Sequence, residues 1–168
     1  MATTLISVAE YLASSYRPDR EYIDGNLEER NLGEYDHANL QTAVAVWFRN
    51  RRREWNIRVV VEQRMQVRPT RFRVPDVTVV DGTQPVEQVL TQPPLIVIEV
   101  LSPEDTWARM EERLGDYLSF GIANVWVLEP GTRRAWTVTR EGRELTSILK
   151  VAGSPIAVAL EELFQELE

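Results

Sequence analysis

The chain has 168 residues, of which 43% are hydrophobic and 27% charged, so we expect a single globular domain over residues 1–168 with a substantial core. The absence of cysteine excludes disulfides and thiolate metal sites, and no apolar run approaches the roughly 20 residues that span a bilayer. A net charge of -7 argues against a basic surface throughout, and the N-terminus lacks the basic start of a secretory signal, so we expect a cytoplasmic protein without membrane association.

The first third of the chain predicts a short helix, a hairpin and a long helix. Ser7 can cap a helix that reaches Ser14, and strand-like residues 21–23 and 26–28 flank Asp24-Gly25, a strong hairpin-turn dipeptide. A long amphipathic helix then follows Asp36 and approaches the arginines at 51–53. Its apolar positions recur at helical spacing: Leu40, Ala43, Val44, Trp47 and Phe48.

The remainder predicts strands interrupted by one helix and closed by another. Ser102-Pro103 begins a helix that runs to Phe120 and stops at Gly121, and a short acidic helix covers 160–167. The expected strands are 57–67, 74–80, 95–101, 125–128, 135–138 and 145–149, with a polar connection over 81–94. This order indicates an α/β fold in which helices flank a mixed β-sheet.

Basic residues are concentrated in one segment. Residues 49–73 contain nine arginines against two glutamates, a local net charge of +7. The simplest interpretation is pairing with the acidic remainder; the alternative is contact with a phosphate backbone, which arginine suits. The candidates for nucleic-acid binding are Arg51, Arg52, Arg53, Arg71 and Arg73.

Two acids stand out because they lie in apolar strands. Asp76 follows Val74-Pro75, and Glu99 lies within 95–101, where a charge is rarely tolerated unless it is paired or binds a metal. We expect Asp76 and Glu99 side by side at one sheet edge, holding Mg²⁺ or Mn²⁺ with the Val100 carbonyl and with Glu34 as a further ligand. The competing interpretation is a salt bridge to one of the arginines.

Several motifs follow one another in a characteristic order and spacing along most of the chain. They are Tyr22-Ile23-Asp24-Gly25, Glu34-Tyr35-Asp36-His37, Val74-Pro75-Asp76-Val77, Ile98-Glu99-Val100-Leu101-Ser102-Pro103 and Tyr117-Leu118-Ser119-Phe120-Gly121-Ile122 leading to Val125-Trp126-Val127. Together they resemble the Uma-two family of bacterial proteins, a branch of the PD-(D/E)XK restriction-endonuclease-like superfamily.

The resemblance implies a restriction-endonuclease-like mixed sheet, a divalent metal and metal-dependent cleavage of DNA, and cutting both strands favours a homodimer. It also implies that the catalytic lysine has moved to the helix after the second acid, four residues before a tyrosine. The matching residues are Arg113 and Tyr117. Arginine keeps the positive charge but does not readily exchange a proton.

This substitution and the acidic net charge keep a second function open, a catalytically degenerate module that binds nucleic acid or a protein partner. A purely structural or oligomeric partner is a third. A paired-carboxylate glycosidase ranks low, because the domain is small for a sugar cleft. His37, the only histidine, is more often structural in such a position than part of a site, and Gln63 faces the site only if strand alternation allows it.

Overall fold

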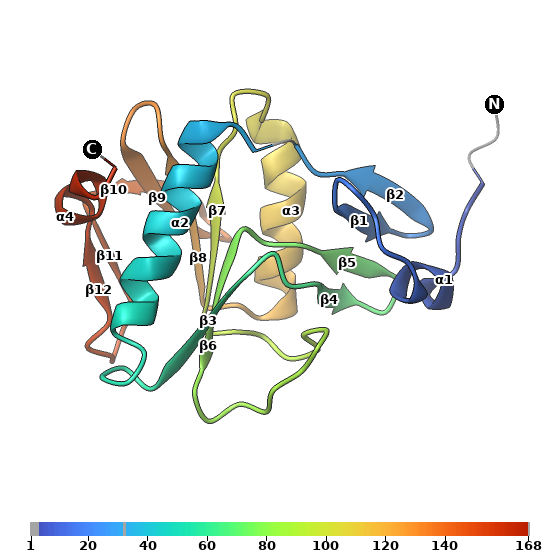
Figure 1. The fold of residues 1–168 in the computed structure, drawn as a ribbon, viewed down its shortest axis with the longest axis horizontal. Coiled ribbons are helices and arrows are strands. Elements are labelled where there is room, and N and C mark those ends of the chain that lie inside the picture. The colour runs from blue at the N-terminus through green and yellow to red at the C-terminus, as the bar shows by residue number, and fades with distance from the viewer. Residues whose placement is uncertain (1–3, 32, 168) are drawn as a thin grey trace.

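A computed structural model describes residues 4–31 and 33–167, in which helices and strands surround a central sheet (Figure 1). The helices are α1 (Val8–Ala13), α2 (Tyr35–Asn50), α3 (Trp107–Phe120) and α4 (Leu160–Gln165). The strands are β1 (Arg20–Ile23), β2 (Asn26–Glu29), β3 (Ile57–Val61), β4 (Met65–Arg68), β5 (Arg71–Arg73), β6 (Val77–Asp81), β7 (Ile96–Val100), β8 (Asn124–Glu129), β9 (Arg134–Thr139), β10 (Gly142–Thr146), β11 (Ile148–Lys150) and β12 (Ala157–Ala159). Over these described ranges, no helix is long and apolar enough to cross a membrane.

The central sheet has six strands in the order β10-β9-β8-β7-β6-β3. Its neighbours are antiparallel except β7 and β8, which run parallel and are joined through α3. A second, antiparallel sheet has the order β2-β1-β5-β4, and β11 pairs with β12. The expected mixed sheet flanked by helices is therefore confirmed.

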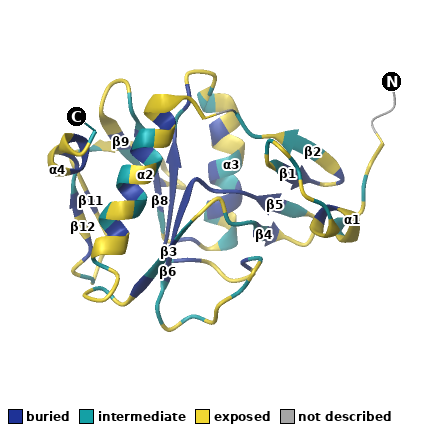
Figure 2. Ribbon diagram, viewed as in Figure 1, coloured by how far each residue is buried: buried dark blue, intermediate teal, exposed yellow. Residues whose placement is uncertain are grey.

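The two faces of the central sheet are covered by different helices. On one face, Leu40, Val44 and Phe48 of α2 pack on alternate residues of β6 and β7, together with α4 and the β11–β12 pair. On the other face, α3 packs on Val97 and its neighbours through Met110, Leu114 and Tyr117. Figure 2 shows the strands between the helices as mostly buried. A side chain's parity along a strand thus decides which helix it meets.

Local turn and cap signals in the sequence are confirmed. Asp24 and Gly25 adopt φ values of 49° and 94°, as the hairpin between β1 and β2 requires. Gly121 ends α3 in the left-handed region with φ 100°. The Ser7 side chain accepts a hydrogen bond from the Glu10 amide at the start of α1.

Two expected strands are wrong, because each is broken into two. The expected strand 57–67 ends at Glu62, where φ is 54°, and its continuation, β4, joins the other sheet. The Glu62 amide donates to the carbonyls of Pro75 and Asp76 at 3.1 and 3.3 Å, so it caps the segment that enters β6. The expected strand 145–149 likewise divides between β10 and β11, and β12 was not expected. Apolar runs by themselves do not show where a strand changes sheets.

Candidate metal and phosphodiester site

Asp76, the residue just before β6, lies opposite Glu99 of the adjacent antiparallel strand β7. Val77 pairs with Ile98, so one further step of this register places Asp76 opposite Glu99. Their exposed fractions are 2% and 1%. The Val100 amide donates to Asp76 Oδ2 at 2.8 Å and fixes that carboxylate against β7. The expected adjacency of the two acids is confirmed.

The carboxylate of Asp76 is held by two cationic side chains. Arg30 forms an ion pair with Oδ1, and His37 Nε2 lies 3.3 Å from Oδ2. Burial would raise the pKa of Asp76, but the His37 hydrogen bond and the Arg30 charge outweigh burial and lower it. Asp76 is therefore ionised at neutral pH, and the competing salt-bridge interpretation describes part of its surroundings.

The carboxyl group of Glu99 is less completely paired with cations than that of Asp76. The Tyr117 hydroxyl donates to its Oε1 at 2.5 Å, and Arg113 Nη1 lies 3.6 Å from its Oε2. Burial raises the pKa of Glu99 to about 8, because Arg113 offsets only part of the desolvation and the Asp76 charge adds to it. In the chain without a metal, Glu99 is thus mostly protonated at neutral pH.

Helix α3 supplies the groups that approach Glu99. Parity places Glu99 on the α3 face of the sheet, and Arg113 and Tyr117 lie one helical turn apart on the side of α3 that packs there. Thr106 caps the helix by accepting from the Arg109 amide at 3.4 Å. The expectation that Arg113 and Tyr117 lie near the two acids is confirmed, and their catalytic roles stay predictions.

Glu21 on β1 is a third buried acid, which the sequence analysis missed. Its Oε2 lies 3.4 Å from Arg113 Nη2 and 2.8 Å from Arg73 Nη1, and its Oε1 accepts from the Val74 amide at 2.9 Å. Only 1% of Glu21 is exposed. The signal that singled out Asp76 and Glu99, a charge within a short apolar strand, also marks Glu21 beside Tyr22 and Ile23.

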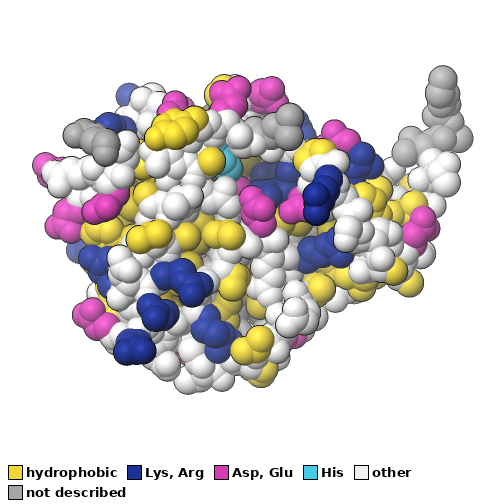
Figure 3. Space-filling view, viewed as in Figure 1, with side chains coloured by type: hydrophobic (Ala, Val, Ile, Leu, Met, Phe, Trp, Pro, Cys, Tyr) yellow, Lys and Arg dark blue, Asp and Glu magenta, His cyan; other side chains and the backbone are white. Residues whose placement is uncertain are grey.

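The five arginines proposed for nucleic-acid binding do not lie on one surface. Arg71 and Arg73 belong to β5, and their side chains, 19% and 3% exposed, bind Asp116. Arg52 and Arg53 are exposed beyond the C-terminal end of α2, where Figure 3 shows Lys and Arg side chains gathered. The Arg51 guanidinium stacks there 3.8 Å from the centre of the Trp47 ring. The Arg71 and Arg73 guanidinium groups are thus paired with acids, and of these five arginines the ones exposed for a phosphate contact are Arg52 and Arg53.

Glu34, the expected further ligand, lies apart from the acid pair. It is the exposed residue before α2 and lines a hollow of about 170 Å³ with His37, Ser102 and Glu129. The same loop after β2 contributes Arg30, a contact of Asp76 that the sequence analysis did not identify. In the described part of the chain, no three His, Asp or Glu side chains form a metal-binding group. The structure therefore does not bring Glu34 to Asp76 and Glu99.

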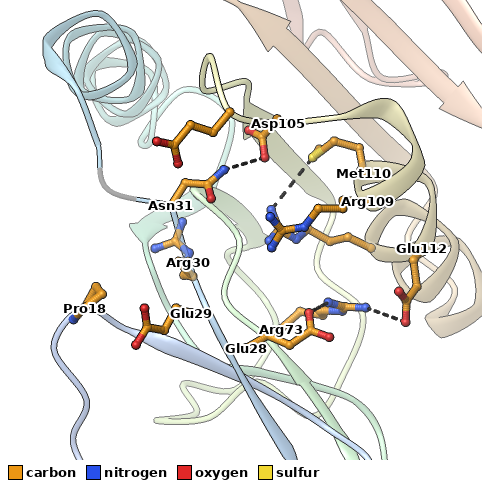
Figure 4. Close-up of a pocket in the computed structure, with 12 residues that line it drawn as sticks. Pro18, Glu28, Glu29, Arg30, Asn31, Arg73, Asp105, Arg109, Met110 and Glu112 are labelled. Atoms are coloured by element: carbon orange, nitrogen blue, oxygen red, sulfur yellow. Dashed lines mark hydrogen bonds and ion pairs between the residues drawn. The ribbon is translucent and has the colours of Figure 1, made fainter.

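A cleft between β2, the loop after it and α3 leads to Asp76 through a smaller hollow. A small polar hollow of about 20 Å³ is lined by Asp76, Val100 and His37, and it shares Arg30 and Arg113 with a cleft of about 740 Å³. In Figure 4, Arg30 and Asn31 lie on one wall of this cleft, and Asp105, Arg109 and Met110 on the opposite wall. The arginines of the cleft are Arg30, Arg73, Arg109 and Arg113, and its acids are Glu28, Glu29, Glu104, Asp105 and Glu112.

The donors at the inner end of the cleft fit a divalent cation. Asp76 and Glu99 offer the oxygen ligands that Mg²⁺ and Mn²⁺ prefer, and Mg²⁺ commonly takes only one or two carboxylates from a protein. A cationic group, the Arg30 guanidinium, already lies at Asp76 Oδ1, whereas Arg113 lies 3.6 Å from Glu99 and offsets only part of the burial that raises the pKa of Glu99. A metal would be held by these two carboxylates, with water completing its shell.

Comparison with known proteins identifies the family of this chain. The family model Uma2, described as "Putative restriction endonuclease", matches residues 8–168. The chain belongs to the Uma2 family. This confirms the resemblance inferred from the motifs, and the family description supports a nuclease.

One solved structure similar to this chain is that of a protein from Anabaena variabilis, titled a putative nuclease belonging to DUF820. The TM-score is 0.83 at 18% identity, and the match covers 97% of this chain and 99% of that chain. At this identity the likeness shows a shared fold. No curated protein matches the chain significantly.

Proposed function

We propose that this Uma2 protein is a metal-dependent endonuclease that hydrolyses phosphodiester bonds in DNA with Mg²⁺ or Mn²⁺. The observation that supports the proposal is the buried pair of Asp76, just before β6, and Glu99 on β7. Asp76 lines a small hollow that shares Arg30 and Arg113 with the cleft. Perturbed carboxyl groups at the end of a cleft are typical of catalytic sites. Two protomers acting together would cut both strands.

Each residue of the site has a defined part in this proposal. When bound, the cation supplies charge neutralisation at the phosphate and acidifies a water. Asp76 and Glu99 hold it, with the Val100 carbonyl as a further oxygen, and the Tyr117 hydroxyl fixes Glu99 through the 2.5 Å hydrogen bond. Arg113, which lines the small hollow, holds a phosphate oxygen.

Arg113 does not serve as the base. Burial disfavours its charged form, but Glu21 and Glu99 outweigh burial and raise its pKa well above that of a free guanidinium. Lys150, the only lysine of the chain, lies on β11 in the two-stranded sheet and shows no contact with the cleft. Neither Arg113 nor Lys150 is thus available as a base, and a bound cation would supply the acidification of the water.

A specific observation favours the alternative function, a degenerate nuclease-fold module that binds nucleic acid or a protein partner. Asp76 is already paired with Arg30 and His37, and an arginine stands where the family resemblance implies a lysine. A chain that retains the fold and has lost turnover would keep these contacts and lose metal binding.

Metal titration separates the two functions. Calorimetry with Mn²⁺ should give a single site in the wild-type chain that is lost in Asp76→Asn and weakened in Glu99→Gln. Exposed Glu34→Gln, away from the pair, serves as the matched control and should bind as the wild type does. Absence of Mn²⁺ binding in the wild type would exclude the metal-dependent endonuclease and favour the degenerate module.

Plasmid cleavage with Mg²⁺ or Mn²⁺ tests turnover. Cleavage should disappear in Glu99→Gln, and Arg113→Lys should cleave faster, by roughly tenfold or more, because lysine supplies a group that can exchange a proton. Cleavage that persists in Glu99→Gln would come from a different site or a contaminant.

DNA binding by the exposed arginines after α2 is tested by its salt dependence. Replacing both Arg52 and Arg53 by alanine should make the plot of log affinity against log salt concentration less steep, by up to about 2 in the magnitude of its slope. Arg140→Ala, an exposed arginine after β9, is the control. An unchanged slope in the double variant would assign these arginines to the protein's own surface and not to DNA.

A further inference from the structure

Arg30 occupies the one position on Asp76 that a metal can take. Asp76 Oδ2 already accepts from the Val100 amide at 2.8 Å and faces His37 Nε2 at 3.3 Å, whereas the contact of Oδ1 is Arg30. The hydrogen bond from the Val100 amide lies where β6 and β7 pair, so it cannot break unless β7 moves. A cation that binds Asp76 at Oδ1 therefore competes with the Arg30 guanidinium for that oxygen.

The Arg30 side chain has both the freedom and the space to leave. Its backbone amide is fixed by the Asp19 carbonyl at 3.1 Å, just after β2 ends, so the long side chain can rotate while its backbone stays in place. Its second acidic neighbour, Glu62, lies 3.5 Å away and is itself 44% exposed, which makes this a weak contact. Arg30 lines both the small hollow and the larger cleft, so a rotation carries its charge from Asp76 into the space where substrate would lie.

Electrostatic repulsion opposes binding of Arg30 and a divalent cation to Asp76 at the same time. A guanidinium and a divalent cation on the same buried carboxylate repel each other strongly, because the surroundings screen charges poorly. Once displaced into the cleft, the guanidinium gains most from an anion there, and a planar guanidinium binds two oxygens of a phosphate. Across the cleft, Arg109 and Arg113 already line the opposite wall.

We propose that Arg30 is an exchangeable cation of the site: it neutralises Asp76 while no metal is bound, and it binds the phosphodiester in the cleft when a metal takes its place. The inference rests on the proposed function. It makes metal and DNA binding mutually reinforcing, because the metal releases the arginine that the phosphate needs, and such coupling is reciprocal.

The test measures metal and DNA binding separately, with Ca²⁺ for DNA binding so that cleavage does not interfere. Arg30→Met should bind Mn²⁺ by calorimetry about tenfold more tightly than the wild type, since the competing charge is gone. The same variant should bind a 12-base-pair DNA duplex in Ca²⁺ about tenfold more weakly by fluorescence anisotropy. Arg30→Lys, which keeps a charge, should bind Mn²⁺ as the wild type does.

Arg109→Met is the matched control, because Arg109 lines the same cleft and makes no described contact with Asp76. It should leave Mn²⁺ affinity unchanged. Opposite effects of Arg30→Met on metal and DNA support the proposal, and equal or weaker Mn²⁺ binding in a variant that melts as the wild type does overturns it. If neither the wild type nor Arg30→Met binds Mn²⁺, the endonuclease proposal fails as well. If the wild type binds Mn²⁺ tightly and Arg30→Met binds it equally well, only the proposed exchange of Arg30 is wrong.

Discussion

Two groups of buried acids lie side by side in this protein, and they differ in how completely they are paired. Glu21 and Asp116 share Arg73, whose guanidinium lies 2.8 Å from Glu21 and 2.7 Å from Asp116. Glu99 has no cation closer than Arg113 at 3.6 Å among the described residues, and its pKa is raised to about 8. Closely paired acids join β1 and β5 to α3, whereas the incompletely paired acid, Glu99, lies against Arg113, which lines the cleft. The difference indicates that the first group maintains the structure and the second is available for a ligand.

The largest expected effect comes from breaking the closely paired group. Arg73→Met should lower the free energy of unfolding by about 3–5 kcal/mol, because it leaves Glu21 and Asp116 buried without their shared partner. Arg113→Met should cost less than half of this, since its contacts with Glu21 and Glu99 are 3.4 and 3.6 Å long. Urea unfolding at pH 7 measures both. Equal losses would show that the two groups are paired equally well.

Glu99→Gln should change how stability depends on pH. A carboxyl group whose pKa is raised in the folded chain binds its proton more tightly there than in the unfolded chain, so its contribution to stability is lost as the pH rises from about 4.5 to about 8. Between pH 6 and pH 9 the wild type should lose roughly 2 kcal/mol relative to Glu99→Gln, by the same linkage. Urea unfolding of both proteins at the two pH values measures this difference. A constant difference would mean that Glu99 is as well paired as Glu21.

The affinity for a metal should depend on pH through the proton that Glu99 binds. Because Glu99 must ionise to bind a cation, Mn²⁺ affinity of the wild type should rise up to about tenfold for each pH unit below 8 and then level off. Calorimetry from pH 6 to pH 9 in buffers of different ionisation enthalpy would also detect the released proton. In Glu99→Gln the remaining affinity should vary much less, and equal pH dependence in both proteins would contradict the assignment to Glu99.

Tyr117→Phe should have the smallest effect. The Tyr117 hydroxyl stabilises the ionised form of Glu99, so its loss raises the pKa of Glu99 further and weakens Mn²⁺ binding at pH 7 by a fewfold, equivalent to about 1 kcal/mol. The affinity at pH 9 should change less than at pH 7. Affinity that falls equally at both pH values would point to lost packing and not to the proton on Glu99.

Part of the site could be predicted because it depends on local pattern. Asp76 and Glu99 interrupt apolar runs. Arg113 and Tyr117 came from the family resemblance; the end of their helix at Gly121 was expected correctly, but its expected start at Ser102-Pro103 is wrong, because α3 begins at Trp107. Glu34 was expected only as a further ligand, since a glutamate just before a helix is ordinary, and the chain places it over a separate hollow. The position of a residue in the loop between β2 and α2 does not tell whether its side chain reaches Asp76. In this loop the Arg30 side chain does so.

The sequence by itself determined most helices and strands, the turns at Asp24-Gly25 and Gly121, and the two acids at the centre of the site, since each follows from the periodicity or conformational limits of neighbouring residues. Only the tertiary structure decided that β4 leaves the central sheet, that Glu21 meets Arg113 across 92 positions, and that Arg30 lies against Asp76 across 46. These contacts depend on strand register and on how two sheets pack against α3. No local pattern contains that information, because the partners become neighbours only when the chain folds.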